Sequence, residues 1–499
     1  MSLREKPSSD LTSSDATFKI PDRPSHNLRH HELILPPTQN LATAGGIFGL
    51  LDQNGPFALQ DSMTRKQIKE WRDSLGLGER INFLTTRSRV YSALGVKSLL
   101  DVDEVFEDPV RMEEARTRAN RSFAERFGIY GSDGEIANKI RNLSTKANNT
   151  RNRATQEIRG SKLFEQSNEV ASADNIADLL RLRLRGADTR IKFEAELKLE
   201  GMKIAALNDQ RAREESERRL VEYRIERERL NKERIERGEE KKPATGTESN
   251  FLEFQRFLDA YVLKSGKAGG DVTILVSHHN PEDFSCETVS RLPQKQVAYV
   301  MHRRAPKGTK YTPIKERVFE HEGRSIQIYS TERLKDDESS DLKLFRKRKT
   351  NPAVAVEDTI GLLAVLKDEA DIEAFVLKLM QGAENANLQF EIDELEDSLS
   401  GSSYSAENAG SSTNFRALKF LATIGSMRVE FLIFDHQAYI DNLYRDGVSH
   451  EEVQARRIFE SGVAKHFFPE SIYGVNLENH RQFVIQQIRR DIRLGVTSR

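Results

Sequence analysis

The segment spanning residues 189–237 constrains the architecture of this chain more than any other. In it, Glu alternates with Arg and Lys at spacings that place oppositely charged side chains four residues apart. Such pairs stabilise a helix, and at 1.5 Å per residue this one would extend about 75 Å. The chain has 499 residues, too many for one ordinary core. We therefore expect two or more domains with connecting helix.

The apolar side chains of this segment leave its partner open. Leu220, Tyr223 and Leu230 suggest a short apolar seam, which Arg227 interrupts. A solvated spacer helix, a helix packed back onto the domains, and a coiled coil that joins two copies in a homo-oligomer all fit this pattern. Acids match the basic residues, so nucleic-acid binding by this segment is the weaker interpretation.

The overall composition excludes several classes of protein. The formal net charge is -1, so any attraction to phosphates must be local. No apolar run has the length of a secretory signal or a bilayer span, which predicts a cytoplasmic protein without a membrane partner. Because Cys286 is the single cysteine, an internal disulfide and a Cys-rich zinc site are excluded. We expect Cys286 to be a small side chain that is buried or half-buried.

Shifts in composition divide the chain into five regions. Residues 1–40 are rich in Ser, Pro and Asp and are expected to be a flexible arm. Residues 41–130 are expected to be a small helical domain, in which Asp108-Pro109 has the form of a helix cap followed by a first-turn proline. A long charged helical region follows at 131–242, then a linker at 243–250, and the last region is 251–499.

Beyond the linker the periodicity changes from helical to mixed. Helices are predicted at 251–263 and 372–380, and strands at 271–277, 296–301, 324–330, 360–366 and 427–434. This alternation predicts an α+β fold, with a helical N-terminal half followed by a mixed-sheet domain.

Two acids and a cationic run supply the material of a magnesium-nucleotide site. Asp358 stands at the edge of the apolar strand 360–366, and Glu430 alternates with apolar residues that point to the other face of its strand. Mg²⁺ prefers one or two carboxylates and completes its shell with phosphate oxygens and water. Cations must surround a transferring phosphoryl group, and residues 333–349 supply them densely.

Five segments together resemble the RelA/SpoT-type nucleotidyltransferase domain, the pyrophosphokinase fold of alarmone synthetases and related toxins. Residues 333–343 match the family's Arg-x-Lys-x-x-x-Ser-x-x-x-Lys segment in register, and residues 358–361 look like its Asp-x-x-Gly turn. Residues 415–419 are similar to its Tyr-x-x-Leu-His element, 429–432 to its Val-Glu-x-Gln strand, and 460–466 to its Glu-x-Gly-x-Ala-x-His segment. The resemblance covers about residues 315–475.

The resemblance implies a nucleotidyltransferase-like fold for residues 251–499 and an ATP-dependent pyrophosphokinase that uses Mg²⁺ and takes ATP as donor. The acceptor would be a ribose 3′-hydroxyl, either of a guanosine nucleotide, as in alarmone synthesis, or of tRNA, as in the toxins. The implied residues are Asp358 and Glu430 for catalysis and metal binding, Arg333, Lys335, Ser339, Lys343 and Arg346 for the ATP phosphates, Phe415 and Lys419 for the acceptor, and Gly361, Glu460 and His466 in support.

The sequence also departs from the family pattern. Leu363 stands where most of these enzymes have arginine, Lys419 replaces a histidine, and Leu432 replaces a glutamine. Phe415 keeps a stacking face but lacks the hydroxyl. A catalytically degenerate nucleotide-binding module with a regulatory or scaffolding role is therefore the alternative function, and a structural helical protein with another C-terminal fold is the third.

Overall fold

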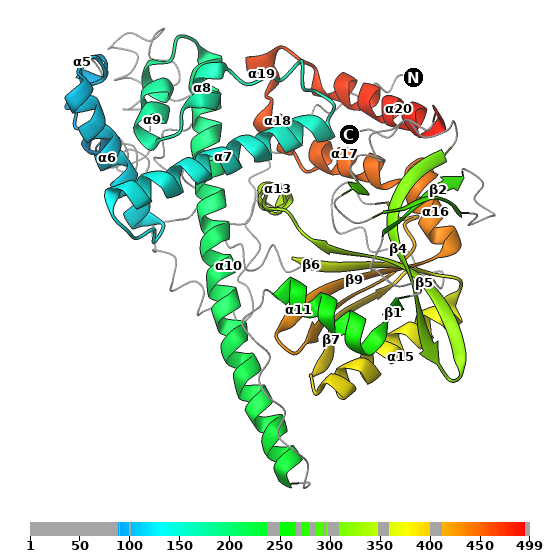
Figure 1. Ribbon diagram of the computed structural model, residues 1–499. Helices are drawn as coiled ribbons and strands as arrows, with labels where there is room; N and C mark the ends of the chain where they lie inside the picture. Colours follow the sequence, from blue (N-terminus) through cyan, green and yellow to red (C-terminus); the bar gives the residue numbers. More distant parts are fainter. Residues whose placement is uncertain are drawn as a thin grey trace, which may run out of the picture. The chain divides into compact units, whose positions relative to one another are not determined.

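The computed structural model has a mixed α+β fold, helical in the N-terminal part and built on a mixed sheet in the C-terminal part, as the sequence predicts (Figure 1). It describes residues 88, 90–98, 101–236, 250–265, 272–278, 286–292, 296–297, 309–347, 359–399 and 412–494. All of them belong to the compact unit Leu41–Arg499. The expected arm at 1–40 and most of the linker at 243–250 lie outside the described residues.

The N-terminal part consists of helices whose ends follow local sequence signals. Their bounds are α5 Asp101–Glu107, α6 Pro109–Arg126, α7 Asp133–Glu157, α8 Asn168–Ser172, α9 Ile176–Arg185 and α10 Thr189–Glu236. Helix α6 starts as predicted, since the Asp108 carboxylate accepts hydrogen bonds from the amides of Val110 and Arg111 and Pro109 opens the first turn. Ser132 and Glu135 form a capping box at the start of α7.

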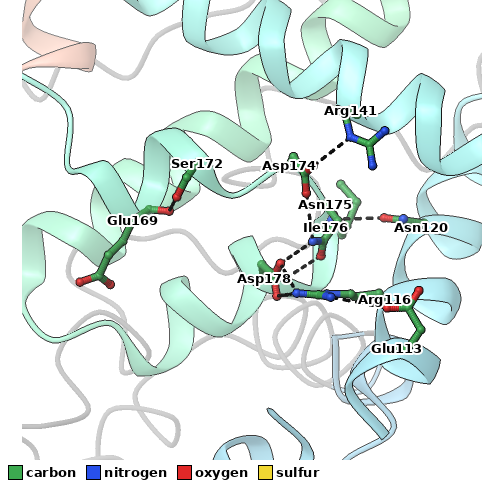
Figure 2. A network of polar contacts seen from close by, with 10 residues as sticks. All are labelled: Glu113, Arg116, Asn120, Arg141, Glu169, Ser172, Asp174, Asn175, Ile176 and Asp178. Carbon is green, nitrogen blue, oxygen red and sulfur yellow. Dashed lines mark hydrogen bonds and ion pairs between the residues drawn. The ribbon is translucent and has the colours of Figure 1, made fainter. Parts of the chain in front are cut away.

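Ion pairs join these helices across the expected domain boundary at residue 130 (Figure 2). Arg116 of α6 donates to Asp178 of α9 at 3.1 Å, and Arg141 of α7 donates to Asp174, just before α9, at 2.9 Å. Helix α6 also packs against both α7 and α9. The helices on the two sides of residue 130 therefore form one bundle, hereafter the helical bundle (α5–α10).

The long charged helix is present as α10, and its first half belongs to the core of the bundle. It packs against α7 and α9, and its buried apolar residues include Ala195, Leu199, Met202 and Ala206. In the second half, Val221 and Ile225 are exposed. The side chains of the suspected seam, Leu220, Tyr223 and Leu230, lie outside what the structure describes.

The C-terminal part is built on a sheet of nine described strands. Their bounds are β1 Lys264–Ser265, β2 Val272–His278, β3 Cys286–Leu292, β4 Thr309–His321, β5 Arg324–Leu334, β6 Ile360–Leu366, β7 Phe390–Asp397, β8 Leu418–Ile424 and β9 Met427–Asp435. The order is β3-β2-β4-β5-β6-β9-β8-β7, with β1 paired to β4. Among these strands, β6 and β9 are the one parallel pair, and all other pairs are antiparallel.

The strands predicted at 271–277, 324–330, 360–366 and 427–434 are confirmed as β2, β5, β6 and β9. Of the strand predicted at 296–301, only residues 296 and 297 are described, and neither lies in a strand. The structure adds β1, β3, β4, β7 and β8, of which β7 is an exposed, acid-rich edge strand. An edge strand buries little of either face, so its sequence lacks the apolar pattern that reveals a buried strand.

One face of the sheet is covered by α11 (Asn250–Phe257), the π-helical turn η2 (Leu258–Val262) and α15 (Glu369–Ala386) (Figure 1). These elements confirm the helices predicted at 251–263 and 372–380. Their buried side chains share one core with the inward residues of the strands, including Phe254, Phe375, Val429 and Phe431. Helix α16 (His436–Tyr444) follows β9 and contacts β6 and β9.

A second core joins the helical bundle to helices from the C-terminal part. These helices are α13 (Asp337–Lys347), α17 (His450–Glu460) and α18 (Val463–Phe467), with α19 (Glu470–Tyr473) and α20 (Leu477–Leu494) alongside. Leu342 and Phe345 of α13 and Phe467 of α18 belong to the same cluster as Ile158 and Leu197 of the bundle. The second core is thus built from both halves of the chain.

No described helix combines the length and apolar character needed to cross a membrane.

Candidate functional site

The site is organised around Arg333 and Glu430, which project from the same face of the sheet. Arg333 of β5 pairs with Gly361 of β6, and Gly361 pairs with Glu430 of β9, so the three residues form one row across three strands. Val429 and Phe431 are fully buried in the covered core, and alternation turns Glu430 to the opposite face. There the Arg333 guanidinium donates a hydrogen bond to the Glu430 carboxylate. We call this side of the sheet the site face.

Gly361 makes this contact geometrically feasible. A Cβ atom at residue 361 would lie 2.7 Å from Nε and 3.1 Å from Cγ of Arg333, closer than side chains tolerate. The Arg333 side chain therefore passes directly over the glycine of the middle strand. Any larger residue at 361 would push Arg333 away from Glu430.

Lys419 brings a second cation to the same acid. Its Nζ lies 3.7 Å from Oε1 of Glu430, and the exposed side-chain fractions are 49% for Arg333, 31% for Lys419 and 11% for Glu430. A largely buried carboxylate thus lies between two cations that reach toward solvent. Opposite charges at this separation attract strongly in a partly desolvated site. If Arg333 or Lys419 moved away, another cation would therefore be favoured beside Glu430.

Three of the four residues that depart from the family pattern, all except Phe415, form a second row next to the first on the site face. Leu363 of β6 pairs with Leu432 of β9, and Leu432 pairs with Lys419 of β8. The row continues to Thr331 of β5 at one end and to Glu396 of β7 at the other. Leu363 and Leu432 are half-buried and pack against the sheet core. The three departures are therefore neighbours rather than scattered changes.

The cationic motif spans the end of β5 and the helix that follows it. The amide of Lys335 donates to the carbonyl of Thr359 at 2.8 Å, which holds the end of β5 beside the start of β6. The amide of Ser339 donates to the Asp336 carboxylate at 2.6 Å and caps α13. Lys343 lies one turn after Ser339, so both share a face of α13.

Arg346 lies on this face of α13 as well, near the bundle. Burial raises the pKa of the Glu157 carboxyl on α7, and the charges of Arg153 and Arg346 oppose this rise. Arg346 therefore belongs to the cationic motif and also acts electrostatically on the bundle.

Three further residues implied by the resemblance contact other parts of the fold. Phe415 packs against the sheet core, its ring centroid 5.8 Å from that of Phe434. Glu460 accepts a hydrogen bond from Arg481 of α20 at 2.6 Å. His466 Nε2 lies 2.8 Å from the carboxylate of Glu200 on α10, so it links α18 to the helical bundle.

The second candidate acid, Asp358, lies outside the described residues, immediately before Thr359. Across the part of the chain that is described, no three His, Cys, Asp or Glu side chains form a group suited to a metal ion. Of the two acids implied to bind the metal, Glu430 is the one that lies among the described residues. A single carboxylate suits Mg²⁺ when a nucleotide supplies the other ligands. In this structure the carboxylate oxygens of Glu430 contact Arg333 and Lys419.

Sequence reasoning missed Asp341, which lies on α13 midway between Ser339 and Lys343. Asp341 is 1% exposed, and its side chain contacts α7 and α10. Burial, reinforced by the nearby charge of Asp337, raises the pKa of Asp341 to about 7. The spacing in the sequence could have revealed Asp341. It lies two residues from Ser339 and two from Lys343, which places it on the opposite side of the helix from both.

Comparison with known proteins gives no relative: no protein-family model, curated protein or solved structure matches this chain.

Proposed function

We propose that this protein is an ATP-dependent pyrophosphokinase of the RelA/SpoT type, which transfers pyrophosphate to a ribose 3′-hydroxyl. The observation that carries the proposal is the row Arg333–Gly361–Glu430. Three residues from separate motifs, remote in sequence, lie in register on one face of a mixed sheet, and the arginine contacts the acid.

In this function the cations bind the donor. Arg333, Lys335 and Lys343 would contact the ATP phosphates, with the Ser339 hydroxyl as a neutral donor and Arg346 at the edge of the bundle. Phosphoryl-type transfer depends on positioning and charge neutralisation, so a set of cations from a strand end and the following helix suits it. When ATP binds, Arg333 exchanges the Glu430 carboxylate for a phosphate.

Glu430, released from Arg333, would then face the reacting groups together with Asp358. Both acids would hold Mg²⁺, which supplies neutralisation of the phosphate charge when it is bound. The oxygen of the 3′-hydroxyl attacks the β-phosphorus of ATP, the bond from this phosphorus to the α–β bridging oxygen breaks, and AMP leaves. Glu430 orients the hydroxyl, whose proton passes to solvent.

The second row supplies the acceptor side. Leu363 and Leu432 offer an apolar strip, and Lys419 offers a cation at its end. Phe415 is half-buried beside Phe434 and would offer the acceptor base the exposed part of its ring. A guanosine nucleotide and the 3′ end of tRNA both present a ribose hydroxyl with nearby phosphates, and these are the two acceptors to test.

The same row favours a second candidate function, a nucleotide-binding regulatory or scaffold module without turnover. Leu363 and Leu432 replace two polar family residues at adjacent positions, so the acceptor side has lost its usual hydrogen-bonding groups together. The donor side does not share this loss. Such a protein would bind ATP and transfer nothing.

The deciding experiment is thin-layer chromatography of products from the full chain with γ-labelled ATP and Mg²⁺, offering GDP, GTP and bulk tRNA separately. We expect label to move into one acceptor and to remain on ATP in Glu430→Gln and Arg333→Ala. Glu320→Gln is the matched control, because Glu320 is an exposed strand acid on β4 away from the row.

Calorimetry with ATP and Mg²⁺ separates the two functions. Binding of ATP without label transfer to any acceptor would establish the regulatory module, and absence of ATP binding by the wild-type chain would exclude both.

A further inference from the structure

Helix α13 carries the candidate phosphate-binding residues on one face and is buried on the other. Ser339, Lys343 and Arg346 are half-buried and, at spacings of four and three residues, lie on one side. The buried arc is made by Ser340, Asp341, Leu342, Leu344 and Phe345. Asp341 lies at the centre of this arc, directly opposite the cationic face.

Asp341 is held by the helical bundle. The Asn208 side-chain amide of α10 donates to one carboxylate oxygen at 3.1 Å, and the Thr150 hydroxyl of α7 donates to the other at 3.3 Å. Asn208 and Thr150 are themselves buried. Each oxygen therefore has one donor, and each donor comes from a different helix.

Further contacts fix the first turn of α13 to α7. Lys146 forms an ion pair with Asp337 at 2.7 Å, and the side-chain amide of Asn149 donates to Glu338 at 3.1 Å. Lys146 also pairs with Asp209 of α10 at 2.6 Å. These contacts lie on the same side of α13 as Asp341, so they act on the helix in the same direction.

The apolar contacts of α13 also belong to the bundle and not to the sheet. Leu342, Leu344 and Phe345 belong to the core that includes Ala154 of α7 and Leu197 of α10. None of them is a member of the sheet core that underlies Arg333 and Glu430. Thus the sheet places Arg333, whereas the bundle places Ser339 and Lys343.

We propose that Asp341 is a positioning residue: by anchoring α13 between α7 and α10, it sets where Ser339 and Lys343 stand relative to Arg333. The inference rests on the proposed function, because it concerns how ATP is bound. It extends that function by making the helical bundle part of the donor site.

A buried polar contact suits this role better than apolar packing does. Apolar burial is non-directional, whereas a carboxylate with one donor on each side is satisfied in a single orientation. A small rotation of α13 would leave Asp341 unpaired and would turn Lys343 away from the phosphates. Misplacement of about 1 Å is enough to weaken binding and reaction substantially.

The test uses the full chain with Asp341→Leu, Asp341→Asn and Thr150→Val. Thr155→Val is the matched control. Thr155, like Thr150, is a buried threonine of α7, but its hydroxyl donates to the carbonyl of Arg151 in the same helix. The readouts are the Kd of ATP·Mg²⁺ by calorimetry, KM and kcat, and amide hydrogen exchange in α13.

We expect Asp341→Leu to raise Kd and KM for ATP by about tenfold or more, with a smaller change in kcat and faster exchange in α13. Thr150→Val, which removes one of the two donors, should show the same change to a lesser degree. Asp341→Asn should stay close to wild type, because an amide can accept from Asn208 and donate to Thr150. Thr155→Val should match wild type in all three readouts.

A purely structural role would lower the folded fraction, and hence apparent kcat, without moving KM. That pattern, or wild-type ATP affinity in folded Asp341→Leu, would overturn the inference while the proposed function stands. If Asp341→Leu does not fold, an unchanged Kd in Thr150→Val overturns it instead. Absence of ATP binding by the wild-type chain would remove the proposed function and this inference with it.

Discussion

The guanidinium of Arg333 and the carboxylate of Glu430 are hydrogen-bonded across Gly361, although 97 residues separate them in the sequence. The contact joins the two sides of the candidate site, because Arg333 begins the cationic segment and Glu430 is the acid of the apolar strand. It requires strand order β5-β6-β9, with a residue lacking Cβ in the middle.

Gly361→Ala should weaken ATP binding by about tenfold or more while leaving the melting temperature within a few degrees of wild type. The new Cβ would meet the flexible Arg333 side chain, not backbone, so Arg333 moves and the strand does not. Calorimetry and thermal unfolding check this. Gly134→Ala is the control, since a Cβ there would meet nothing within 4 Å. Unchanged ATP affinity in Gly361→Ala would show that ATP binding does not depend on the position of Arg333 over Gly361.

Lys419→Met should raise KM for the acceptor by about tenfold and leave KM for ATP unchanged, because Lys419 lies in the row assigned to the acceptor. Stability should change by less than about 1 kcal/mol, since the pair with Glu430 is partly exposed. Steady-state kinetics with each substrate varied in turn measures both constants. Lys367→Met, at an exposed lysine, is the control. A rise in KM for ATP alone would move Lys419 to the donor side.

A fragment of residues 246–499 should fail to form a stable, soluble domain. Without α7 and α10 it would expose Leu342, Leu344, Phe345, Phe467 and Phe468, which are buried in the second core. Exposed apolar area of this kind promotes aggregation. Size-exclusion chromatography and calorimetric unfolding check this, and a monomer with the melting temperature of the full chain would contradict it.

Glu194→Ala should destabilise the protein by about 3–5 kcal/mol, because it leaves Arg151 buried without its counter-charge. The Glu194 side chain is 0% exposed and lies 3.2 Å from Arg151, and it also accepts from the Tyr473 hydroxyl at 2.8 Å. Urea unfolding measures the loss. Glu169→Ala, an exposed acid on α8, should change stability by less than about 0.5 kcal/mol. If Glu194→Ala lost no more stability than Glu169→Ala, Glu194 would not anchor α19 through its contact with Tyr473.

Stability should fall between about pH 4 and pH 7 through Asp341, whose pKa burial raises from 3.8 to about 7 in the folded chain. The folded state holds this proton more tightly than the unfolded state, so the contribution is complete below the unfolded pKa and is lost as pH rises through the folded one. Asp341→Asn should therefore gain on wild type by on the order of 2 kcal/mol between pH 5 and pH 7. Urea unfolding at both pH values tests this. Parallel pH profiles for the two proteins would place the ionised carboxylate in the native state.

Local sequence patterns predicted the pieces of this structure that depend on neighbours in the chain. The charge spacing of residues 189–237 predicted α10, Asp108-Pro109 predicted the start of α6, and apolar runs predicted β6 and β9. Alternation also predicted that Glu430 faces away from Val429 and Phe431. These features follow from helix and strand periodicity, which residues close in sequence determine.

The tertiary structure alone decided which of these pieces meet. Strand order placed Arg333 beside Glu430 and brought Leu363, Leu432 and Lys419 into one row. Helix packing placed α13 in a core with α7 and α10 and buried Asp341 between Asn208 and Thr150. Pairing of strands and packing of helices depend on complementarity between surfaces far apart in the chain, so no local period records them.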